Sequence, residues 1–193
     1  MRANLQNRLA KAITDSLDPK NIIALLSLLV GLHYGWSGLG WAVLTILFCA
    51  VLPIAYIVYT DGRGDWAARH VPDRARRLAI IPVILASVGT CLALMHVGNA
   101  PSPLLSMVAA MLATLGGIWP ITLAWKISVH TAVLTGALAM LAMLYGPWLL
   151  LGAALVPAVA WSRARLKDHT VAQTIAGAAL GATVAAPVFG LGL

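Results

Sequence analysis

The sequence predicts an all-α fold: a polytopic transmembrane helix bundle of about six to seven spans, preceded by an N-terminal amphipathic helix at the membrane interface. Hydrophobic residues make up 61% of the 193 residues, and charged residues only 10%. A soluble domain of this length could not shield so much apolar surface from water, so lipid must be the solvent. A span needs roughly 20 apolar residues, which leaves no length for a large domain outside the membrane.

The N-terminal segment, residues 1–20, forms a unit separate from the membrane domain of residues 21–193. Its apolar residues recur at a spacing of four, at Leu5, Leu9, Ile13 and Leu17. Basic residues fall between them, at Arg2, Arg8, Lys11 and Lys20. This spacing gathers the apolar side chains near one helical face, which is typical of a helix lying on a membrane. A frayed polar tail is the alternative.

Apolar runs then predict the spans, at 21–34, 38–59, 78–97, 103–125, 131–146, 148–161 and 171–190. Several runs are short, so the count is either six or about seven. Turn signals without charge separate some of them, at residues 34–38, 98–103 and 146–147.

Charge lies on one side of this predicted arrangement. All 13 basic residues fall in the N-terminal segment or in residues 60–77, 126–130 and 162–170, which emerge on the same face. The excess of Lys and Arg predicts that this face is cytoplasmic, in a prokaryotic inner (plasma) membrane. The basic residues form no continuous stripe, so a nucleic-acid partner is not expected. The sequence gives no indication of oligomeric state.

Histidine, serine and basic residues gather in three of these charged segments. They are His70 to Arg77, Lys126 to His130, and Ser162 to Gln173. One imidazole can attack phosphorus and another can protonate the leaving alkoxide, while cations neutralise the phosphate oxygens. This chemistry requires no metal or other cofactor.

At these residues the chain resembles the phosphatidic-acid-phosphatase type 2 superfamily of lipid phosphatases, whose signature is KxxxxxxRP, PSGH and SRxxxxxHxxxD. Ser162, Arg163 and His169 keep the spacing of the third motif, with Gln173 in place of its Asp. Ser128 and His130 keep the register of the second motif, without its Pro and Gly. In the first motif Arg77 matches the Arg, whereas Leu78 replaces Pro and His70 replaces Lys.

The resemblance implies a role for each matching residue. His169 would be the nucleophile that forms a phosphohistidine, and His130 the general acid. Phosphate would be bound by Arg163, Ser128, Arg77 and His70, to which the charge and location of Lys126 add a further cation. Gln173 takes the place of the Asp that orients the nucleophile, and its amide oxygen can accept an N–H bond but carries no charge. Asp168 or Asp65 could supply the missing carboxylate.

The expected function is hydrolysis of a membrane lipid phosphate, either a phospholipid or a (poly)prenyl phosphate or diphosphate, at the cytoplasmic face. Two alternatives stay open. Asp61 and Asp65 have the DxxxD spacing with which membrane prenyltransferases and terpene cyclases hold Mg²⁺ on a prenyl diphosphate. The chain could also be a catalytically inactive relative that binds lipid.

Overall fold

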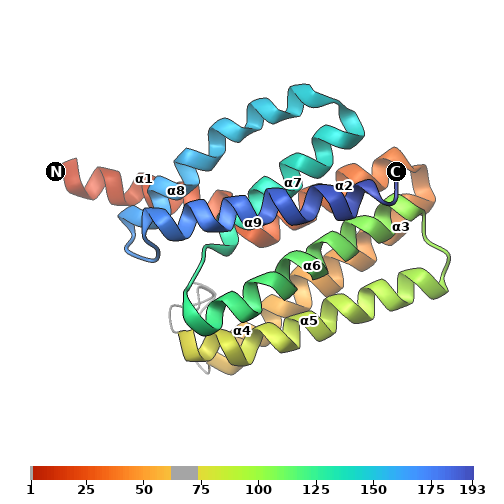
Figure 1. Cartoon of the computed structure of the whole chain (residues 1–193), viewed down its shortest axis with the longest axis horizontal. Helices are drawn as coiled ribbons and strands as arrows, with labels where there is room; N and C mark the ends of the chain where they lie inside the picture. The colour runs from red at the N-terminus through yellow and green to blue at the C-terminus, as the bar shows by residue number, and fades with distance from the viewer. Residues whose placement is uncertain (1, 62–73) are drawn as a thin grey trace.

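A computed structural model describes residues 2–61 and 74–193 of the chain, and this described part is helical throughout, with no strand (Figure 1). The α-helices are α1 (Arg2–Ser16), α2 (Pro19–His33), α3 (Gly35–Ile46), α4 (Leu52–Asp61), α5 (Arg74–Val97), α6 (Ser102–Ala124), α7 (Val129–Tyr145), α8 (Leu155–Arg165) and α9 (Val171–Gly190). A π-helical turn, η1 (Leu47–Val51), joins α3 to α4, and a 3₁₀ segment, η3 (Pro147–Ala154), leads into α8. The all-α prediction is confirmed.

Five helical segments in the described part are long and apolar enough to cross a membrane, which identifies a membrane protein by length and composition. They are Gly35–Thr60, Arg76–Val97, Ser102–Ala124, Pro147–Arg165 and Val171–Gly190. Helix α7 is apolar but has only 17 residues, and α2 has 15. A total of six or about seven spans therefore stays a prediction.

The N-terminal segment is helical and packs against the last turns of α8. The Thr14 and Ser162 hydroxyls lie 3.1 Å apart, and Ala10 and Thr14 are buried. Leu5 and Leu9 are exposed on the opposite part of α1. The placement of this helix at a membrane interface stays a prediction.

The connections that carry charge lie at one end of the bundle. The α1–α2, α6–α7 and α8–α9 connections meet there, whereas the α2–α3 and α5–α6 turns and the C-terminus lie at the other end (Figure 1). At that opposite end, Gly35 and Gly146 adopt positive φ angles of 69° and 112°, as expected of turn glycines. Exposed aromatic residues lie near both ends: Trp36 and Trp148 at the uncharged end, and Tyr59, Trp125 and Trp161 at the charged end. Such paired belts are typical of proteins that span a bilayer.

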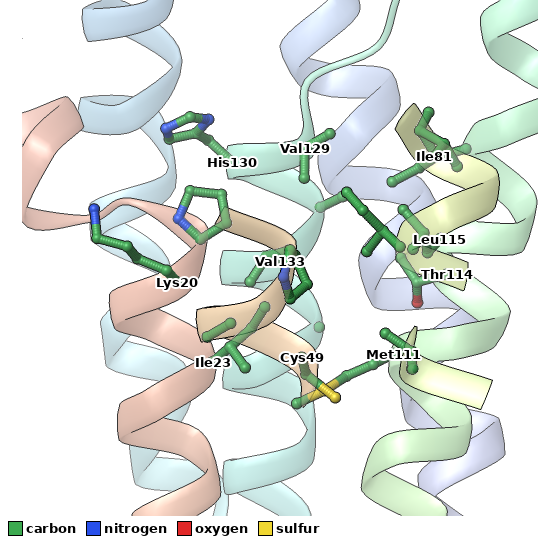
Figure 2. Close-up of a pocket in the computed structure, with 18 of the residues that line it drawn as sticks. Lys20, Ile23, Cys49, Ile81, Met111, Thr114, Leu115, Val129, His130 and Val133 are labelled. Carbon is green, nitrogen blue, oxygen red and sulfur yellow. The ribbon is translucent and has the colours of Figure 1, made fainter. Parts of the chain in front are cut away.

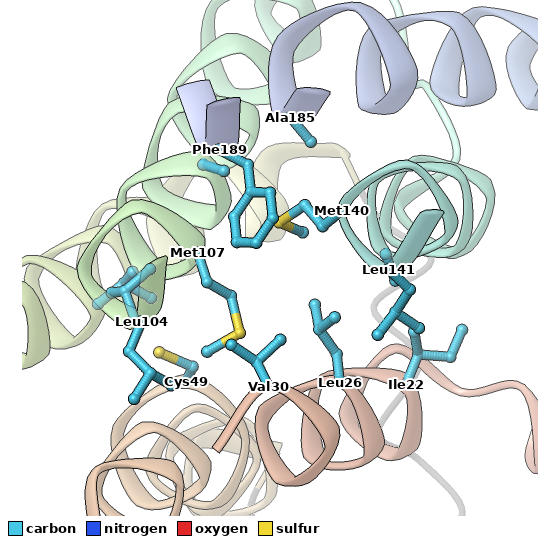
Figure 3. Packing of buried hydrophobic residues seen from close by; sticks show 14 of the residues in the cluster. Ile22, Leu26, Val30, Cys49, Leu104, Met107, Met140, Leu141, Ala185 and Phe189 are labelled. Carbon is cyan, nitrogen blue, oxygen red and sulfur yellow. The ribbon is translucent and has the colours of Figure 1, made fainter. Parts of the chain in front are cut away.

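The core between the helices is apolar and closely packed. Val30, Met107 and Phe189 are fully buried and meet at the centre of the cluster in Figure 3. Helices α7 and α9 approach so closely that a Cβ at Gly177 would lie 2.6 Å from the Thr131 hydroxyl. That hydroxyl donates to the Thr174 carbonyl at 2.8 Å. The N-terminus of α7 is thereby held beside the N-terminus of α9.

Candidate functional site

The α8–α9 loop folds back tightly on the end of α8. Lys167 adopts a left-handed conformation with φ of 60°, and the backbone N–H groups of Asp168 and His169 donate to the Arg163 carbonyl at 3.1 and 3.3 Å. This turn brings an Asp168 carboxylate oxygen to 3.1 Å from Arg163 Nη2. The carboxylate proposed as a substitute partner for His169 is thus paired with Arg163.

Arg163 is the most deeply buried cation among the described residues, with 2% of its surface exposed. Its Nη2 pairs with Asp168, but Nε and Nη1 are buried and have no hydrogen-bond partner in the described part of the chain. A buried N–H group without an acceptor is costly, and a buried guanidinium more so. Unused N–H donors on a buried guanidinium can each donate to an oxygen of a bound phosphate.

The His169 ring is held by the first turn of α9. Its Nδ1 lies 3.2 Å from the Gln173 side-chain oxygen, and the backbone N–H of Thr170 donates to the same oxygen at 3.0 Å. The Thr170 hydroxyl accepts in turn from the Gln173 N–H, which completes a capping box. Gln173 thus contacts the His169 ring and also caps the start of α9.

This capping box also determines which nitrogen of His169 carries the proton. A backbone N–H can only donate, so the Gln173 atom facing Thr170 must be the amide oxygen. That oxygen is an acceptor, so Nδ1 of His169 must be the donor. The lone pair is then on Nε2, which is buried and has no hydrogen-bond partner among the described residues.

Burial and nearby cations keep the His169 ring neutral. Burial first, and then the charges of Arg77, Lys126 and Arg163, lower its pKa from 6.5 to about 3, while the hydrogen bond that Nδ1 donates to Gln173 opposes the shift. The imidazole of the apo protein is consequently a free base at neutral pH, which is the form that a nucleophile requires.

Three other predicted residues, Ser128, Lys126 and Arg77, lie close to this part of the chain. Ser128 is fully buried as the N-cap of α7, and its N–H donates to the Gln173 carbonyl at 3.1 Å. Lys126 Nζ donates to the Asp168 carbonyl at 2.9 Å, and Arg77 Nη1 to the Ile127 carbonyl at 3.4 Å. Burial and the charge of Arg77 lower the pKa of Lys126. These contacts tie the α6–α7 and α8–α9 loops together.

A cavity of about 240 Å³ opens beside this cluster. Its charged end is lined by Asp18, Lys20, Arg77, His130 and Arg163. Figure 2 shows His130 and Lys20 at that end, above the apolar side chains of Ile23, Cys49 and Met111. His130 is buried, and it lines the same cavity as Arg163 and Arg77, whereas His169, Lys126 and Ser128 are not among the lining residues.

Lys20 lines the charged end of the cavity, because the α1–α2 turn lies at the charged end of the bundle. Asp18 caps α2 by accepting from the Lys20 N–H at 3.1 Å, and its carboxylate lies 3.6 Å from Lys20 Nζ. Neither residue belongs to a motif. Only the packing of α1 and α2 against the bundle brings them to the cavity.

Other predicted residues are not located. His70 and Asp65 lie outside the described residues, and Asp61 is the last residue of α4, with a side chain that is not described. The Mg²⁺ alternative at Asp61 and Asp65 therefore stays a prediction. Within residues 2–61 and 74–193 no group of three His, Cys, Asp or Glu side chains is arranged to hold a metal ion.

Comparison of the chain with protein-family models, with curated proteins and with solved structures finds no match.

The low pKa of His169 leads to a pH-dependent prediction. Between about pH 6.5 and 3 the unfolded chain binds a proton that the folded chain does not, so His169 makes the free energy of unfolding fall as the pH falls through this range. The ¹⁵N chemical shifts of the ring should show protonated Nδ1 and unprotonated Nε2 at neutral pH, and adding inorganic phosphate should raise the pKa by offsetting the cations. Titration of the apo ring near 6.5 would contradict this environment.

Proposed function

We propose that the chain is a membrane-embedded lipid phosphate phosphatase that hydrolyses a phospholipid or (poly)prenyl phosphate or diphosphate through a phosphohistidine intermediate. One observation carries the proposal: Nε2 of the neutral, buried His169 and two nitrogens of the Arg163 guanidinium, Nε and Nη1, are buried without hydrogen-bond partners in the described part of the chain. A nucleophilic nitrogen and an anion-binding group with unused donors are the two parts that phosphoryl transfer to histidine needs.

The reaction follows from the roles of these atoms. Nε2 of His169 attacks phosphorus, the bond from phosphorus to the lipid oxygen breaks, and His130 in its protonated form gives its proton to the leaving oxygen. Water then attacks the phosphohistidine, His130 takes a proton from that water, and inorganic phosphate and free His169 are released. Arg163, Arg77 and Lys126 neutralise the charge on the phosphate oxygens. The Gln173 oxygen accepts a hydrogen bond from Nδ1–H of His169 while the ring is positively charged.

We further propose that the charged end of the bundle faces the cytoplasm of a prokaryote, with the chain in the plasma membrane and α1 lying at the membrane surface. The support is the concentration of Lys and Arg at this end. It is also supported by the exposure of Leu5 and Leu9 on α1, which a membrane surface would cover. The substrate would then be a lipid phosphate of the inner leaflet.

The test uses purified full-length protein in detergent with a panel of phospholipid and prenyl phosphates, in the presence of EDTA. We expect release of inorganic phosphate, and an acid-labile, base-stable phosphoryl group on residue 169 in acid-free quenched samples analysed by mass spectrometry. Release that occurs only with added Mg²⁺ would overturn this mechanism in favour of the Asp61 and Asp65 alternative. Absence of release with every lipid would overturn it in favour of an inactive lipid-binding relative.

A further inference from the structure

The cavity beside the site extends along the bundle axis, into the membrane domain. On α7 its lining runs from His130 to Met140, and on α5 from Arg77 to Val88. A rise of 1.5 Å per residue makes each of these distances about 15 Å. The cavity therefore reaches from the charged end to about the middle of a hydrocarbon core that is roughly 30 Å thick.

Below its charged end the lining of the cavity is apolar. Isoleucine, valine, leucine, methionine, alanine and proline side chains, mostly from α2, α4, α5, α6 and α7, form this lining, and Thr114 is an uncharged exception. The Thr114 hydroxyl is already bonded to the Ala110 carbonyl of its own helix at 2.8 Å, so it offers little to a polar ligand. Such a lining suits a hydrocarbon chain and would reject a polar substituent.

The deep end of the cavity is closed by the packed core. Met140, Cys49 and Ala110 form its deepest lining, and Val30, Met107 and Phe189 lie beyond them with no exposed surface (Figures 2 and 3). No lining residue on α7 lies further from the site than Met140. The cavity is therefore a dead end, which sets a limit on the length of any chain inside it.

The volume of about 240 Å³ is smaller than the roughly 300–1,000 Å³ of pockets that enclose drug-sized ligands. It suits a slender hydrocarbon chain better than a bulky group. A lipid with two acyl chains could leave one of them in the bilayer.

We infer that this cavity binds the hydrocarbon chain of a single-chain lipid phosphate, to a depth of about 15 Å, with its phosphate at the charged end, where Arg163 lines the cavity. The inference rests on the proposed function for the headgroup, but the chain-binding part stands on the cavity alone. It selects single-chain substrates over two-chain phospholipids, and it makes Thr114, halfway along the α6 wall, a residue that determines chain length.

The experiment measures binding of alkyl phosphonates, whose carbon–phosphorus bond cannot be hydrolysed, as a series from butyl to hexadecyl. Affinity of the wild type should rise about fourfold per added methylene and then level off where the chain reaches the closed end. Thr114→Phe should make the affinity level off at a shorter chain. Thr114→Val keeps the side-chain volume and should leave the dependence of affinity on chain length unchanged. Met107→Ala opens the core beyond the cavity, so the affinity should keep rising to longer chains.

The controls separate the cavity from simple partitioning into detergent, which would be the same for every variant. An identical profile in wild type, Thr114→Phe and Met107→Ala, with no levelling off, would overturn the inference. So would tighter binding of a diacylglycerol phosphonate than of its single-chain counterpart. If the phosphonates bind with the expected profile but the matching alkyl phosphates are not hydrolysed, the proposed function fails and the chain site stands. If the alkyl phosphates are hydrolysed but neither binding nor hydrolysis depends on chain length, the proposed function stands and the chain site fails.

Discussion

His169→Ala should reduce the release of phosphate by at least about 10⁴-fold, because the variant loses the atom that attacks phosphorus and the remaining cations cannot replace it. The measurement is phosphate release from the best lipid substrate, corrected for release without protein. His96→Ala is the matched control, since His96 is exposed near the uncharged end of α5 and should retain full activity. Equal background release by wild type and His169→Ala would remove the hydrolase proposal altogether.

Arg163→Met should lower turnover by roughly 10²- to 10³-fold, the usual cost of losing a preorganised donor to transition-state oxygens. The same variant should leave the stability of the apo protein about unchanged. It removes a buried guanidinium with two unpartnered nitrogens and retains much of the side-chain volume, and Asp168, which loses its partner, is 29% exposed to solvent. A large loss of turnover without a loss of stability distinguishes a binding residue from a structural one.

Thermal unfolding in detergent, with and without phosphate, measures the stability part of this prediction. Phosphate should stabilise the wild type but not Arg163→Met. Arg165→Met is the control, since Arg165 lies two residues further along α8, has the same side chain, and is exposed. A large loss of apo stability in Arg163→Met alone would mean that the buried Arg163–Asp168 pair serves mainly to hold the α8–α9 loop.

Much of the helical arrangement could be predicted from sequence because its signals are local. Glycine and proline at the breaks end each apolar run, and the structure places turns at Gly35 and Gly146 as expected. The π-helical turn at Leu47–Val51 and the 3₁₀ segment at Pro147–Ala154 were not predicted. Both lie within continuous apolar runs, where periodicity carries no sign of a change in hydrogen-bond pattern.

In the candidate site, too, the contacts within a short motif could be predicted from sequence, and those that depend on the packing of distant segments could not. The spacing of Arg163, His169 and Gln173 is a local motif, and the structure brings these residues together within one loop and one helical turn. The inclusion of Lys20 depends on how α1 and α2 pack, which no spacing encodes. The partner of Asp168 likewise depends on the left-handed turn at Lys167, a conformation for which a lysine gives no signal.

The capping box has a consequence for how variants of this chain should be interpreted. The Gln173 oxygen accepts from Thr170, which secures the start of α9, and also orients the imidazole of His169. Val171 lies in that first turn, is 60% exposed, and has no place among the site residues. A Val171→Gly change that frays this turn would still misalign the reactive nitrogen, so an inactive variant at this exposed position would report on helix propensity and not on a missing chemical group.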